Sequence, residues 1–198
     1  MAEPKGFIGR VTRCSTFGFV GAVRVPEPDL PSFGSFCQVE AQRGRSQVIG
    51  VIYDISVEDD AFARQLATAE GLTQEQLQDT QANRQVPVEF SALAVGYRNG
   101  GEIRHTVPPQ PPMTLAEIYP LEPEDVKLFT ERLDFLPLIL AAPQLPVDHL
   151  LTACLRQAAL ARPESARRPF LVEAGRACAR LLAGDLARLN NLIRGLQP

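Results

Sequence analysis

The chain has 198 residues and a net charge of −3, and 45% of its residues are hydrophobic and 22% charged. This composition is typical of a globular protein and excludes wholesale disorder and a disulfide-dependent scaffold. Its longest apolar stretch, residues 135–142, is interrupted by Pro137 and is far shorter than the roughly 20 residues that a membrane helix needs. The first residues lack the apolar core of a secretory signal, so we expect a cytoplasmic protein with no membrane contact.

The first half of the sequence predicts short β-strands separated by turns. Apolar residues alternate or cluster in six segments, at residues 6–14, 17–25, 36–40, 47–57, 84–97 and 102–107. The segment 47–57 is apolar on both faces, which is typical of a central strand covered on both sides. The dipeptide Asn99-Gly100 predicts a hairpin turn before the last segment. Six short strands in this order favour a small closed barrel, because closure removes free sheet edges.

Helical patterns interrupt and follow these strands. Residues 58–82 change to helical spacing and predict a helical insertion in the barrel. The proline-rich segment 108–112 predicts a stiff link. After it, the pattern predicts helices, the last of them over residues 170–195. We therefore expect an α+β protein, with a six-stranded β-barrel at residues 1–112 and a helical C-terminal region at residues 113–198.

Side chains that carry catalysis are scarce in this sequence. The two histidines, His105 and His149, lie outside any nucleophile motif. The two lysines, Lys5 and Lys127, do not follow a glycine, so the chain contains no P-loop, and no dinucleotide-binding glycine motif follows a strand. Acidic groups such as residues 58–60 and 122–125 coincide with predicted helix starts, where carboxylates usually cap the helix or face solvent. We expect no catalytic, metal or cofactor site and a protein that is not an enzyme.

The cysteines also give no sign of a site. Cys14, Cys37, Cys154 and Cys178 form no C-x-x-C pair, and no histidine lies at zinc-ligand spacing beside them. Because free cysteine is among the most buried residue types, we interpret Cys154 and Cys178 as small core side chains in a reducing compartment.

Charge is divided unevenly along the chain. Residues 1–149 carry 12 basic and 20 acidic side chains, a net charge of −8, whereas residues 150–198 carry 8 arginines and 3 acids, a net charge of +5. Arginines dispersed at helical spacing are typical of a solvated face or of a face that docks on an acidic surface; a nucleic-acid-binding tail is the alternative. The candidate contacts to a partner or to phosphate are Arg167, Arg168, Arg176 and Arg180.

Three motifs in the first 130 residues occur together in a characteristic order. They are Ile8-Gly9-Arg10-Val11 with Phe17-Gly18-Phe19-Val20, the loop Leu30-Pro31-Ser32-Phe33-Gly34-Ser35-Phe36-Cys37-Gln38-Val39, and Val48-Ile49-Gly50-Val51-Ile52-Tyr53-Asp54-Ile55. In order and spacing they resemble the HAS-barrel, the N-terminal barrel that HerA-type DNA translocases share with rotary ATP synthase subunits. The helical insertion, the proline-rich exit and the following helix also resemble that family.

The resemblance ends where HerA-like proteins continue into a P-loop ATPase core, because here a helical region follows instead. It therefore implies the role of the barrel itself, which is ring assembly and docking of a partner such as a nuclease. Our leading hypothesis is a non-catalytic HAS-barrel adaptor that oligomerises or docks a separate HerA-like ATPase or nuclease of DNA processing. The alternative is a nucleic-acid-binding module that uses the arginine-rich C-terminal helices. Against it stand the acidic first part, the absence of tryptophan and an aromatic content of only 7%.

Overall fold

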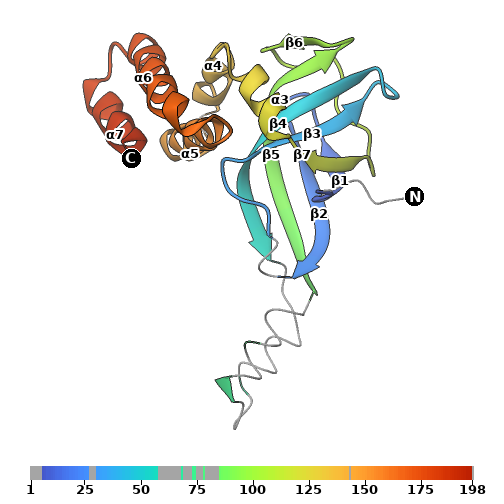
Figure 1. The fold of residues 1–198 in the computed structure, drawn as a ribbon. Helices are drawn as coiled ribbons and strands as arrows, with labels where there is room; N and C mark the ends of the chain where they lie inside the picture. Colours follow the sequence, from blue (N-terminus) through green and yellow to red (C-terminus); the bar gives the residue numbers. More distant parts are fainter. Residues whose placement is uncertain are drawn as a thin grey trace.

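The protein is described by a computed structural model that covers residues 6–26, 30–57, 85–142 and 144–197, together with Thr68, Thr73, Gln74 and Gln78. A β-barrel forms one part of the molecule, and a group of helices lies beside it (Figure 1). The helical insertion predicted at residues 58–82 lies outside the described residues, apart from those four single positions.

Seven antiparallel strands of the described chain form one sheet. They are β1 (Gly9–Cys14), β2 (Gly18–Pro26), β3 (Phe36–Ala41), β4 (Ser46–Val57), β5 (Gln85–Asn99), β6 (Glu102–Arg104) and β7 (Glu117–Pro120). Six of them follow the order β2-β1-β7-β3-β4-β5, and the pairing of β2 with β5 closes these six into a barrel. The predicted α+β fold with a closed six-stranded barrel is confirmed.

The sixth barrel strand is β7, whereas the sequence pattern predicted residues 102–107 for this place. Within that segment, β6 is only three residues long and pairs with β5 alone, across the predicted turn at Gly100. β7 lies between β1 and β3 and pairs with both. The barrel therefore continues beyond the predicted boundary at residue 112, as far as Pro120.

Strand β4 contributes side chains to two separate apolar cores, which confirms the predicted cover on both sides for residues 48–52, whereas Asp54, Ser56 and Val57 near its end are exposed. Val48 and Ile52 belong to the barrel interior, with Phe19, Phe90 and Ile118 from other strands. Neighbouring β4 residues, Ile49 and Val51, belong instead to the core between the barrel and the helices. Successive side chains of a strand alternate between the two faces of the sheet, so a strand covered on both faces must be apolar throughout.

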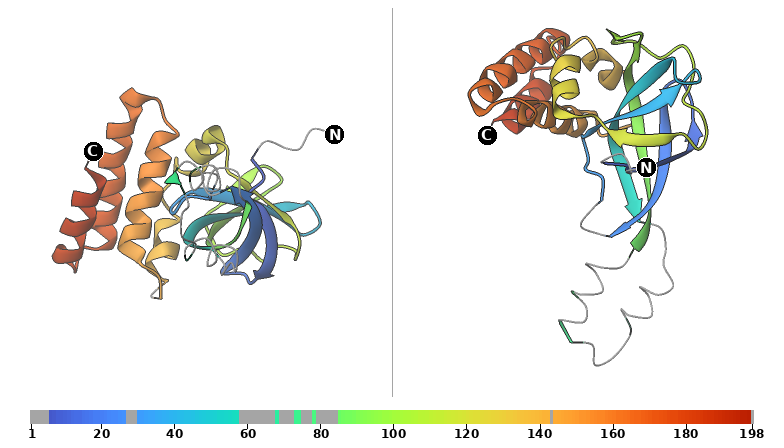
Figure 2. Two further views of the ribbon diagram at one scale, coloured as in Figure 1. Left: turned by 90° about the horizontal axis from the view of Figure 1, so that it is seen from below. Right: turned by 45° about the vertical axis from the view of Figure 1, so that its right-hand side comes forward.

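Five helices of the described chain lie on one side of the barrel, and the last two of them pack on the far side of α5 rather than on the barrel (Figure 2). They are α3 (Pro123–Phe129), α4 (Leu136–Leu140), α5 (Val147–Leu160), α6 (Glu164–Leu181) and α7 (Leu186–Leu196). Phe36 of β3 packs edge-to-face on Phe129 and Phe135, with ring centroids 6.0 and 6.1 Å apart. The barrel and the helices thus share one continuous core. Among the helices that the structure describes, none combines the length and the apolar character needed to cross a membrane.

The segment predicted as one helix over residues 170–195 is instead divided between α6 and α7. α6 begins at Glu164, and Pro169 lies inside it without ending it. The break falls at residues 182–185, where Asp185 is the N-cap of α7 and its Oδ1 accepts a hydrogen bond of 3.0 Å from the backbone N–H of Arg188. Capping explains why an acid lies at this position inside the segment that was predicted as one helix.

Candidate functional site

A groove of about 550 Å³ lies where the barrel meets α4. Its walls come from the turn between β1 and β2, from β5, and from α4 with the segment that follows it. The side chains that define it are Arg13, Phe17, Tyr53, Leu93, Leu138 and Leu145. A concave, mainly apolar site of this size with few polar groups is the usual form of a binding pocket.

Phe17 is the most exposed aromatic side chain on the rim of this groove, at 67% of its free accessibility. Its backbone is nevertheless fixed. The N–H of Phe17 donates to Ser15 Oγ at 3.1 Å, and its carbonyl accepts from the N–H of Ala94 at 2.9 Å. The turn is closed by a further bond of 2.8 Å from the N–H of Ser15 to the carbonyl of Gly18. The ring of Phe17 is therefore exposed to solvent on a turn whose backbone is already ordered. A partner that binds at this ring would cost the turn little further conformational entropy.

Arg13 is the one charged residue among the described residues that line the groove. Its side chain is exposed, and no described residue forms an ion pair with it. The groove is thus complementary to an apolar segment that carries a carboxylate beside its apolar residues.

The four arginines singled out from the sequence all lie on α6, but the structure brings only three of them together. Arg168, Arg176 and Arg180 are exposed and recur at multiples of four residues, which places them along one face of the helix. Arg167 lies elsewhere on α6, is half-buried, and donates from Nε to the carbonyl of Arg162 at 3.1 Å. Within the part of the chain that the structure describes, no carboxylate pairs with the three exposed arginines.

Arg162, which the sequence analysis did not single out, is the buried arginine of the helical region, with 8% of its surface exposed. Its guanidinium donates to the carbonyls of Ala158 at 2.7 Å, Thr130 at 3.2 Å and Lys127 at 3.4 Å. It also lies 3.7 Å from the ring centroid of Phe170. These carbonyls belong to the C-terminal ends of α3 and α5, where the helix dipole favours a cation. Arg162 therefore positions α3 on the other helices. In the sequence, the signal that could have identified it is its position directly before Pro163, at the end of an apolar helical repeat.

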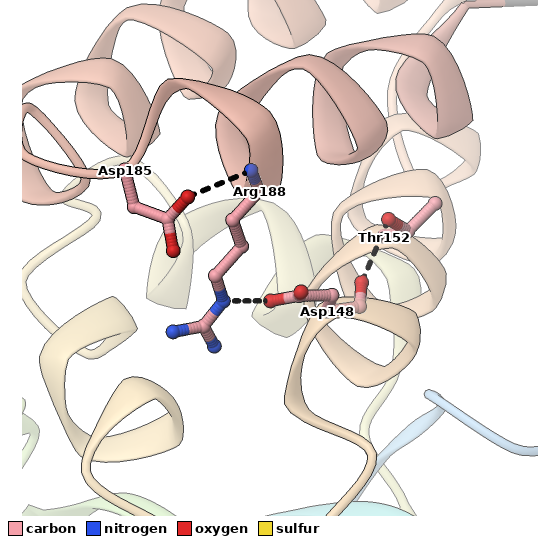
Figure 3. A network of polar contacts seen from close by, with 4 residues as sticks. All are labelled: Asp148, Thr152, Asp185 and Arg188. Atoms are coloured by element: carbon pink, nitrogen blue, oxygen red, sulfur yellow. Dashed lines mark hydrogen bonds and ion pairs between the residues drawn. The ribbon is translucent and has the colours of Figure 1, made fainter.

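A polar network fixes α7 to α5 (Figure 3). Arg188 Nε donates to Asp148 Oδ1 at 2.6 Å, while the hydroxyl of Thr152 donates to the carbonyl of Asp148 at 2.8 Å. An arginine of the basic C-terminal part is therefore held by an acid of the acidic first part. In contrast to Arg188, the exposed Arg168, Arg176 and Arg180 of α6 form no ion pair with a described residue.

The next residues to place are the two histidines and the three buried cysteines. His105 Nε2 donates to the carbonyl of Phe129 at 2.9 Å, and burial lowers the pKa of this imidazole. His149 is exposed on α5. Burial raises the pKa of Cys37 and Cys154 well above the ordinary range, and that of Cys178 to about 11. These three cysteines are buried, which confirms that Cys154 and Cys178 are core side chains.

A second hollow of about 570 Å³ lies between β3 and the segment 113–117. Two acids line it, Glu117 and the exposed Glu40. Glu117 is already engaged, since Arg10 Nη2 donates to it at 2.7 Å and the hydroxyl of Tyr119 donates to its other oxygen. The bond from Tyr119 lowers the pKa of Glu117 and raises that of Tyr119. Among the described residues, no group of three His, Cys, Asp or Glu side chains is arranged to hold a metal ion.

Comparison of the chain with models of protein families and with curated protein sequences found no match. The class of protein is therefore defined by the fold alone, a closed antiparallel β-barrel with a helical region docked on its side.

Proposed function

We propose that the chain is a non-catalytic adaptor of the HAS-barrel type that holds a separate protein in the groove between the barrel and α4. The observation that carries this proposal is Phe17, an aromatic side chain exposed on a rigid turn at the rim of an apolar groove. The sequence resemblance suggests that the partner is a HerA-like ATPase or a nuclease of DNA processing. Its docking segment would be apolar, with a carboxylate placed to meet Arg13.

The energetics support a protein partner at this place. Fully burying a phenylalanine side chain contributes roughly 1.5–3 kcal/mol, which corresponds to about a 10- to 100-fold change in the dissociation constant. Aromatic residues in well-packed pockets, surrounded by contacts that exclude water, are the usual hot spots of protein interfaces. Phe17 is therefore the residue at which the partner's affinity should be most sensitive.

The test is a pull-down of the tagged full-length chain from native lysate, at moderate salt and with nuclease treatment, read by mass spectrometry. Phe17→Ser is compared with Leu186→Ser, since Leu186 has a similar exposure and lies outside the groove. We expect a P-loop ATPase or a nuclease in stoichiometric amount with the wild type and the Leu186 variant, and its loss with the Phe17 variant. Equal capture by both variants, or no such partner at all, would overturn the proposal.

The second candidate function is nucleic-acid binding through α6. The observation that favours it is the set of exposed arginines without ion-pair partners among the described residues, Arg168, Arg176 and Arg180. Fluorescence anisotropy with labelled single- and double-stranded DNA and RNA at 50 and 200 mM salt tests this function, because phosphate contacts release counterions and weaken steeply with salt. Absence of binding at 50 mM salt rejects it.

A further inference from the structure

One face of α6 combines positive charge with an exposed apolar centre. It consists of Arg168, Val172, Arg176 and Arg180, which follow one another at four-residue spacing and are called the α6 face here. Val172 is 47% exposed, and the three arginines are exposed on either side of it. Glu173 lies beside Val172 and is exposed as well.

A second face, at α3, has the opposite charge around a similar centre. It consists of Glu124 and Leu128, four residues apart on α3, with Glu131 in the turn that follows the helix, and is called the α3 face here. Leu128 is 48% exposed, and both glutamates are exposed. Lys127 lies beside Leu128. Within the described residues, neither glutamate forms an ion pair.

We propose that copies of this chain associate by docking the α6 face of one copy on the α3 face of another. In such a contact Val172 packs on Leu128, and the arginines surround the glutamates. Glu173 beside the α6 face and Lys127 beside the α3 face also become a complementary pair, and Glu164 is a further exposed acid one turn before Arg168. The inference goes beyond the proposed function, which concerns a separate partner, and it uses a surface separate from the groove.

The two faces belong to one rigid unit of the molecule. Arg162 ties the carbonyl end of α3 to α5, directly before α6 begins at Glu164. Each copy therefore presents an α6 face and an α3 face in fixed relative positions. Such a pair gives a two-fold dimer when each copy contributes both faces to one contact, and a ring or a chain of copies when it does not.

Charge also distinguishes a second copy from nucleic acid as the occupant of the α6 face. Three arginines would neutralise only a few phosphates, and Glu173 would repel the same backbone. The described C-terminal helices place no exposed aromatic side chain on this face for base stacking. An acidic surface with an apolar centre matches all of these features, and the chain itself carries one at α3.

The test is sedimentation equilibrium of the full-length chain from about 5 to 500 μM at low and physiological salt, with three double variants. Arg168→Glu with Arg176→Glu reverses the α6 face, and Glu124→Arg with Glu131→Arg reverses the α3 face. Arg24→Glu with Arg43→Glu makes the same change in net charge as the α6 variant, at exposed arginines of β2 and the β3–β4 turn. Circular dichroism verifies that each variant is folded.

We expect the wild type and the control variant to associate reversibly above the 21.7 kDa of one chain, less so as salt rises. Each reversed variant alone should associate at least about tenfold more weakly, and an equimolar mixture of the two should associate again because the charges are complementary once more. A chain that stays at 21.7 kDa throughout, or a mixture that fails to associate, overturns the inference. Neither result bears on partner binding at Phe17, so the proposed groove is judged separately.

Discussion

Replacement of Gly34 by alanine tests the joint between the barrel and the helices. Gly34 lies in the loop before β3 with a φ of +81°, and its N–H donates to the carbonyl of Ile52 at 2.7 Å. A Cβ at this position would lie 2.4 Å from the Cβ of Ala153 and 2.8 Å from the Ala153 carbonyl carbon on α5. The loop thus touches both β4 and α5, and only a residue without a side chain fits between them.

Two costs combine in Gly34→Ala. The left-handed backbone conformation costs a residue with a Cβ about 1–2 kcal/mol, and forcing an extra methyl group into a packed contact costs about 1–3 kcal/mol. We therefore expect a loss of about 2–5 kcal/mol in the free energy of unfolding. For a chain of this length each kcal/mol lowers the melting temperature by about 2–4 °C, so the expected decrease is on the order of 10 °C.

Urea unfolding followed by circular dichroism measures this loss, and Gly101→Ala is the matched control. Gly101 has a φ of +90° but nothing within 4 Å of the added Cβ, so its variant isolates the backbone cost of about 1–2 kcal/mol. Equal losses for Gly34→Ala and Gly101→Ala would refute the claim that α5 presses on this loop.

Three further predictions concern the helical region and its contacts. Burial lowers the pKa of His105 below its ordinary value of 6.5. The neutral imidazole therefore stabilises the fold fully above pH 6.5, and this contribution declines as the pH falls below that value. Between about pH 7.5 and 5 the free energy of unfolding should fall less for His105→Gln than for the wild type. Arg162→Met leaves buried carbonyls without donors and should cost about 3 kcal/mol in urea unfolding, with a smaller loss for the lysine variant. Gly195→Ala places a Cβ 2.9 Å from Thr152 Cγ2 and should lower the melting temperature, whereas Gly175→Ala, which meets nothing within 4 Å, should raise it by the helix preference of alanine.

The barrel was predictable because its long strands carry a clear pattern. The middle of β4 is apolar on both faces, and it contributes to both cores, as β3 and β5 also do. The sequence pattern did not predict β7 as a strand, because β7 is only four residues long, ends in Pro120 and follows a proline-rich segment. Its place in the sheet depends on pairing with β1 and β3, which are distant in sequence. Local alternation cannot reveal a strand whose stability comes from its two neighbours.

The candidate site was less predictable than the fold. A periodic pattern located Arg168, Arg176 and Arg180 on an exposed helix face, but spacing alone could not separate them from Arg167, which turns toward the carbonyl of Arg162. The groove is formed by the β1–β2 turn, β5 and α4, which are distant in sequence, so no single segment of the sequence predicts it. The sequence predicted Phe17 as the first residue of a strand, whereas the structure places it in the turn before β2, where its side chain is exposed.

The groove and the core between barrel and helices depend on each other. One wall of the groove is α4, and α4 is held against the barrel by the same cluster in which Phe36, Phe129 and Phe135 meet. The opposite wall is the fixed turn that carries Phe17. A partner that spans both walls would contact residues from two parts of the chain at once, and its binding would stabilise their docking by mass action. A barrel alone would offer the aromatic ring without the second wall, which gives the helical region a direct role in the proposed adaptor.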